Sequence, residues 1–140
     1  MSKKSPKIAA LIESCRGRDL DAHYLGYFEC FNRGLFYEAH EVLEELWLAE
    51  RHGLDGSFYK GLIQLAGAFV HLQKDRLRPA AALFKLAGSN LRKYPAFHQR
   101  LRVSDTLSWI DRWLVRLEAN SFTANPLSRE PAPRLVLAER

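Results

Sequence analysis

The stretch Phe36-Tyr37-Glu38-Ala39-His40-Glu41-Val42-Leu43-Glu44-Glu45-Leu46-Trp47 has the residue spacing of an amphipathic helix. At about 100° per residue, its apolar side chains recur on one side of the helix, and a histidine lies among them. The members of this stripe are Phe36, Ala39, His40, Leu43, Leu46 and Trp47. Glu38, Glu41 and Glu45 point away from the stripe. Glu44 lies on its border, one turn beyond His40, so the stretch predicts a core-facing helix with a histidine beside a carboxylate.

The same helical spacing continues through most of the chain. It predicts helices over residues 6–16, 20–33, 35–52, 57–74, 79–94 and 104–119. Ser5 is the expected N-cap of the first helix, with Pro6 in its first turn, and Gly17 and Gly34 are expected to end the first two helices. The segment 57–74 is apolar on two faces, which is typical of a central helix. We expect no strand, and the short connections predict an all-α fold, a compact bundle of about six helices built from antiparallel helical hairpins.

Composition and length predict a globular protein with one main domain. The chain has 140 residues, enough for one hydrophobic core, and we expect a single helical domain over residues 1–119. Residues 120–140 contain several prolines and are expected to form an extended tail, whose apolar end Leu135-Val136-Leu137 could dock as an arm. Cys15 and Cys30 are too few for a disulfide framework and lack metal-site spacing, which favours a reduced, cytoplasmic protein.

The distribution of charge restricts the class of partner. Residues 19–60 carry three basic and nine acidic residues, whereas residues 61–120 carry ten basic and four acidic residues. This division predicts an acidic half packed beside a basic half, whereas nucleic-acid binding favours one continuous basic face. The longest apolar run, residues 62–70, is too short to span a membrane. We therefore expect no membrane partner and favour a protein or small ligand over nucleic acid. A homodimer, and phosphate or nucleic-acid binding by the basic half, are further options.

Four polar side chains on two of the expected helices form the candidate site. His40 and Glu44 project from one face of their helix, and Gln64 and His71 lie on one side of the next, near small residues that permit close helix packing. If these two helices pack together, the four side chains line one polar pocket. The candidate pocket residues, including two neighbours on the first helix, are His40, Glu44, Gln64, His71, Glu41 and Trp47.

Three interpretations of this constellation remain open. His40 could be a buried histidine that a hydrogen-bonded network satisfies, or it could line a small ligand pocket. The third is a divalent transition-metal site, for zinc, iron or manganese, with His40, Glu44 and His71 as ligands and Glu41 as a candidate base. The metalloprotease signature His-Glu-x-x-His is absent, because the sequence has His-Glu-x-x-Glu at residues 40–44. The sequence therefore assigns no catalytic residue.

Two blocks of the sequence resemble a known family. The first is residues 31–47, with Glu-Ala-His-Glu followed by Trp47, and the second is Gly61-Leu62-Ile63-Gln64, which leads to His71-Leu72. Over about residues 24–94 the chain resembles the all-helical family catalogued as domain of unknown function 309. The family usually has Gly-Asn after the second His-Leu, where this chain has Gln73-Lys74. The resemblance implies a small all-helical domain and supplies no activity.

These observations predict a small soluble helical protein that acts as an interaction or ligand-binding module with a polar His/Glu network. The alternative is a metal-dependent hydrolase that uses His40, Glu44 and His71.

Overall fold

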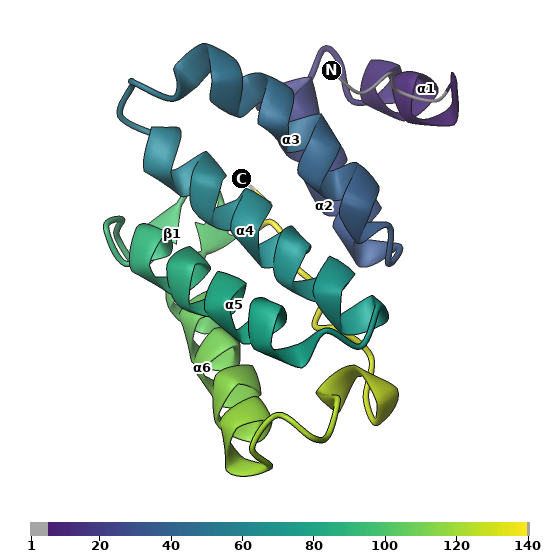
Figure 1. Cartoon of the computed structure of the whole chain (residues 1–140). Coiled ribbons are helices and arrows are strands. Elements are labelled where there is room, and N and C mark those ends of the chain that lie inside the picture. The colour runs from purple at the N-terminus through teal and green to yellow at the C-terminus, as the bar shows by residue number, and fades with distance from the viewer. Residues whose placement is uncertain (1–5, 140) are drawn as a thin grey trace.

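Six α-helices and one short β-hairpin dominate the computed structural model, which describes residues 6–139 (Figure 1). The helices are α1 (Pro6–Ser14), α2 (Ala22–Asn32), α3 (Phe36–Glu50), α4 (Gly56–Gln73), α5 (Leu77–Leu91) and α6 (Val103–Ala119). Between α5 and α6, β1 (Phe97–His98) pairs antiparallel with β2 (Leu101–Arg102), and the short 3-10 helix η1 (Pro126–Ser128) follows α6. The expected all-α bundle is confirmed, and the N-cap expected at Ser5 lies outside the described residues.

Helix α4 runs through the middle of the bundle, with α3 on one side and α5 on the other (Figure 1). Its two apolar stripes account for this position, because Leu62 of one stripe and Ala66 of the other are both fully buried. The helices pair in sequence order, α2 with α3 and α4 with α5, as antiparallel hairpins, and α6 packs on α5. Within the described residues 6–139, no helix is long and apolar enough to cross a membrane.

Aromatic side chains from four other helices surround Phe69 of α4. The ring centroids of its neighbours lie 5.0 to 5.9 Å from that of Phe69. These neighbours are Phe31 of α2, Phe36 of α3, Phe84 of α5, and Trp109 and Trp113 of α6. Several of the contacts are edge-to-face, the arrangement that aromatic quadrupoles favour. One fully buried ring therefore joins most of the bundle.

Helix α3 buries a wider sector than its apolar stripe predicts. Val42 lies outside that stripe and is nevertheless fully buried, since α2 covers this side of α3. The close approach depends on Gly26 of α2, where a Cβ atom would lie 3.2 Å from Cγ1 of Val42. A helix packed between two others needs apolar side chains on both sides, and Val42 provides one on the side of α2, where it faces a glycine.

The β-hairpin corrects the expectation that the chain has no strand. Its two-residue turn, Gln99-Arg100, has left-handed φ values of 46° and 63°, which glycine or asparagine usually supplies. Tertiary contacts hold this turn instead, because Asp55 accepts a hydrogen bond from Gln99 and contacts His98, and Arg100 forms an ion pair with Asp19. Helix α5 also begins earlier than expected, at Leu77, which places Pro79 within its first turn.

We expect Phe69→Ala to lower the free energy of unfolding by about 3–5 kcal/mol, because it leaves a cavity where five aromatic rings meet. Urea unfolding followed by circular dichroism measures this loss. Leu54→Ala is the control, since Leu54 is 96% exposed and its truncation should change stability by less than about 0.5 kcal/mol. Equal effects of the two substitutions would contradict the central role of Phe69.

Candidate functional site

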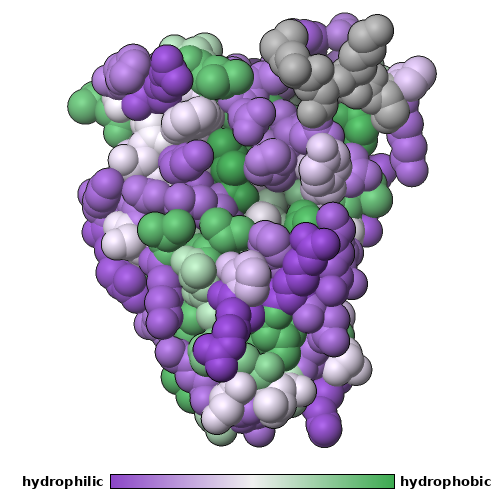
Figure 2. All heavy atoms as spheres, viewed as in Figure 1, coloured by the Kyte–Doolittle hydropathy of each residue, from purple (hydrophilic) through white to green (hydrophobic). Residues whose placement is uncertain are grey.

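A groove with a cavity volume of about 340 Å³, the α4 groove, lies over α4 between α3 and α5. Its lining residues are Tyr37 and His40 of α3, Lys60, Ile63, Gln64, Gly67, Val70 and His71 of α4, and Leu83 of α5. Figure 2 shows hydrophobic surface emerging between hydrophilic ridges on the side of the molecule that carries α3, α4 and α5. The groove therefore combines apolar walls with a few polar groups, which is the usual composition of a ligand site.

The α4 groove follows from the spacing of residues along α4. Lys60, Gln64, Gly67 and His71 are three or four residues apart and so lie along one face of the helix. Gly67 has no side chain, which leaves the middle of this face open. A Cβ atom there would lie 3.1 Å from Cδ1 of Leu83, a flexible side chain on the opposite wall.

Three of the six candidate residues line this groove together: His40, Gln64 and His71. Glu44 is paired with His40, since its Oε2 lies 3.4 Å from His40 Nε2 and both side chains are partly exposed. Glu41 and Trp47 are not among the lining residues. Helical spacing thus identified the histidines and the glutamine, and it also placed Glu44 beside His40.

Lys60 is a groove residue that the sequence analysis did not identify. Lys60 lines the groove, and its Nζ lies 4.4 Å from the centroid of the Trp47 ring, a cation–π contact. Within residues 6–139, the Lys and Arg residues that form ion pairs with carboxylates are Arg16, Arg33, Lys85, Arg92, Arg100 and Arg116. Lys60 therefore has no carboxylate partner within the described structure. Its position one turn before Gln64 is the signal that could have found it.

The side chain of Gln64 is held in one orientation. Its Oε1 accepts a hydrogen bond of 2.7 Å from Nδ2 of Asn90 on α5. Because the carbonyl oxygen is engaged, the amide nitrogen of Gln64 remains as a donor at the groove.

His71 lies at the other end of the groove with an unsatisfied nitrogen. Nδ1 is buried and has no hydrogen-bond partner in the described structure. Desolvation lowers the pKa of His71 below 6.5, and the positive charges of Arg76 and Lys74 lower it further. The ring is therefore neutral at pH 7. A neutral imidazole with an unpaired buried nitrogen is unusual, because buried polar atoms normally have a partner.

The described residues contain no cluster of side chains that matches the metal hypothesis. Within residues 6–139, no group of three or more His, Cys, Asp or Glu side chains is arranged to hold a metal ion. His40, Glu44 and His71, the ligands that spacing suggested, are therefore not gathered into such a group. Two of them, His40 and Glu44, still form a pair, and they do so without a third donor.

A second polar cluster lies outside the groove, where α4 begins. Asp55 precedes α4 and contacts His98 Nε2 at 2.8 Å through one oxygen and accepts from Gln99 Nε2 at 2.8 Å through the other. Tyr24 donates from its hydroxyl to the Gln99 carbonyl at 3.0 Å, and burial raises its pKa so that it keeps this proton. These groups satisfy one another, so the cluster fixes the β-hairpin against α2 and α4.

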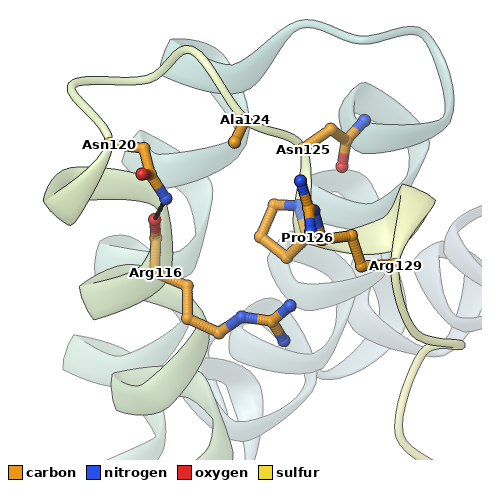
Figure 3. A pocket seen from close by; sticks show the side chains of 6 residues that line it. All are labelled: Arg116, Asn120, Ala124, Asn125, Pro126 and Arg129. Atoms are coloured by element: carbon orange, nitrogen blue, oxygen red, sulfur yellow. Dashed lines mark hydrogen bonds between the residues drawn. The ribbon is translucent and has the colours of Figure 1, made fainter.

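A third polar region is the pocket after α6 that Figure 3 shows, with a volume of about 320 Å³. In this view Arg116 extends from α6 toward Pro126 and Arg129. The Arg116 guanidinium is already engaged, since it forms an ion pair with Glu130 and lies 5.4 Å from the Trp113 ring centroid. These charges hold the chain beyond α6 in place and leave the α4 groove as the better candidate site.

Comparison with known proteins places the α4 groove within a family region. Residues 24–83 match the family model described as Domain of unknown function (DUF309), which confirms the resemblance over these residues. Every residue that lines the groove, from Tyr37 to Leu83, falls inside this match. No curated protein and no solved structure matches the chain.

The lowered pKa of His71 makes stability depend on pH in a defined direction. Below 6.5 the unfolded chain binds a proton at His71 more readily than the folded chain, so the free energy of unfolding falls as the pH decreases. His71→Gln removes this titration, and we expect the variant to lose less stability than the wild type between about pH 7.5 and pH 5. Urea midpoints at both pH values measure the difference. An equal loss in both proteins would contradict a desolvated His71.

Proposed function

We propose that the family region, residues 24–83, is a binding module that holds a small amphiphilic anion in the α4 groove. The ligand class is a carboxylate with an apolar body. The observation that carries this proposal is the presence in one apolar groove of a lysine without a carboxylate partner in the described structure, an oriented amide donor and a histidine.

The polar groups of the groove favour an anionic head group. Lys60 carries a positive charge that no carboxylate of the described residues neutralises, and the amide of Gln64 can donate one turn further along α4. Hydrogen bonds from such donors to an ionised acceptor are stronger than neutral ones. A cationic ligand would meet repulsion from Lys60, and a neutral ligand would leave its charge uncompensated.

The rest of the groove favours an apolar body. Ile63, Val70 and Leu83 contribute aliphatic side chains to its walls, and Gly67 leaves room between them. Removing aliphatic surface from water provides about 25 cal/mol per Å² of apolar area, which suits a short hydrocarbon chain. A ligand that combines both features uses the whole groove, whereas inorganic anions would contact only its polar groups.

Octanoate provides a direct test of the ligand class. We expect octanoate to shift the backbone amide resonance of Gly67 in a saturable NMR titration, and octylamine, with the same chain and opposite charge, to bind at least about tenfold more weakly. Lys60→Gln should weaken octanoate binding about tenfold, because a charge-assisted contact is lost. Lys85→Gln is the matched control, since Lys85 pairs with Glu118 on the exposed surface of α5. Equal binding of octylamine and octanoate would overturn the proposal.

Gly67→Ala separates the binding role of this residue from any role in stability. Alanine favours a helix interior by about 1 kcal/mol over glycine, and the added Cβ meets only the flexible end of Leu83. We therefore expect unchanged or higher stability together with weaker octanoate binding, measured by urea unfolding and by an octanoate titration that follows the backbone amide of Val70 in both proteins. A variant that loses stability but binds octanoate normally would show that Gly67 serves packing.

A further inference from the structure

The last described residues form an extended segment, and none of them lines the α4 groove. This segment, residues 131–139, is called the strap. It has no regular secondary structure, and its yellow trace runs behind α4 in Figure 1. Leu135, in its middle, is only 3% exposed and belongs to the main hydrophobic core.

Asn32 of α2 recognises the strap through its backbone. Nδ2 of Asn32 donates to the Leu135 carbonyl oxygen at 2.8 Å, and Oδ1 of Asn32 accepts from the Leu135 N–H at 2.8 Å. A third backbone contact follows, in which the Ala138 N–H donates to the carbonyl oxygen of Arg100 at 2.8 Å. One amide side chain thus pairs with both polar groups of a single residue, as a neighbouring strand would.

The side chains of the strap alternate between core and solvent. Leu135 is buried and Leu137 is half-buried against the core, whereas Arg134 and Val136, which is 66% exposed, face outward. This period of two is that of an extended chain with one face bound. The contacts are therefore those of peptide recognition, in which backbone hydrogen bonds give affinity and alternate side chains give specificity.

The strap leaves room beside it. A cavity of about 260 Å³ borders it on the side of β2 and α6, where Leu101, Thr106 and Trp109 contribute to the lining. A second cavity, of about 320 Å³, borders it on the side of α2, with Phe31 and Phe36 among its lining residues. A peptide with larger side chains than Ala132 or Pro133 would fill this space and bury more apolar area.

We propose that the site occupied by the strap is a recognition site for an extended peptide of a partner protein, which the strap fills as an internal competitor. The site binds a peptide that has aliphatic residues at the positions corresponding to Leu135 and Leu137. Asn32 forms hydrogen bonds with the backbone of this peptide, as it does with that of Leu135. This inference is independent of the α4 groove, because the two sites share no lining residue.

Internal competition determines how the site behaves in solution. A tethered segment acts at an effective concentration on the order of millimolar, so a free peptide at micromolar concentration competes poorly with the intact strap. The apparent dissociation constant equals the intrinsic one divided by the fraction of sites that the strap leaves open. Any change that weakens the strap alone should therefore reveal the site without altering its walls.

The test uses a fluorescein-labelled peptide with the sequence of residues 130–139 and the full chain in each variant. Leu135→Asp places a charge at a buried position of the strap, and we expect this variant to bind the peptide at least about tenfold more tightly than the wild type. Val136→Asp is the matched control, since its side chain faces outward, and should bind like the wild type. Fluorescence anisotropy measures both affinities, and circular dichroism checks the fold.

Two further variants define the site. Adding Asn32→Ala to Leu135→Asp should abolish most of the gain, and a peptide that carries the Leu135→Asp change should not bind. If Leu135→Asp unfolds the chain, Leu135→Ala replaces it, with a smaller gain expected. A folded variant that binds the peptide no better than the wild type overturns the proposal. So does a dimeric wild type that becomes monomeric on Leu135→Asp, because the strap would then exchange between copies.

Discussion

Burial of α4 on two opposite sides is the constraint on which the rest of this structure depends. Its apolar stripes require a helix on each side, α3 on one and α5 on the other, and Phe69 contacts aromatic rings from α2, α3, α5 and α6. A helix covered in this way has only a narrow strip left toward solvent. In α4 that strip carries Lys60, Gln64 and His71, and the flanking helices become its walls. The groove is thus a geometric consequence of the core.

The fold was predictable because helical periodicity is a local signal. The two-sided pattern of α4 predicted its central position, and one-sided patterns predicted the helices around it. The β-hairpin was not predictable in the same way, since Gln99 and Arg100 have no intrinsic preference for left-handed φ. Asp55 and Asp19, far away in sequence, hold that turn, and such contacts leave no mark on the local sequence.

In the candidate site, too, helical spacing predicted some residues, whereas contacts between distant parts of the chain determined others. It was possible to predict that His40, Gln64 and His71 lie in one groove, because helical spacing fixes the face on which each residue lies. The short connection between α3 and α4 also predicted that these two helices pack together. Lys60 was missed because a lysine on a helix is ordinarily solvent-exposed, and its place in the groove lining depends on how α3 and α5 pack beside α4. The metal hypothesis required distances between helices, which spacing along a helix cannot supply. Within residues 6–139 no group of three or more His, Cys, Asp or Glu side chains is arranged to hold a metal ion.

The glycines inside the helices differ in whether close packing requires them. At Gly26 and Gly61 a Cβ atom would press on core or interface side chains, Val42 in the first case and Asn90 and Leu91 in the second. Close helix approach accounts for both. At Gly67 the only neighbour is the end of Leu83 beside the open groove, so packing does not demand a glycine there.

A glycine inside a helix costs about 0.5–1 kcal/mol relative to alanine, and the unpaired Nδ1 of His71, one turn further along α4, adds a desolvation penalty. Both departures from the most stable choice lie on the one strip of α4 that faces the groove. Sequences tend to depart from local rules where a site requires it. The position of these two residues therefore favours binding over packing as the reason for the groove.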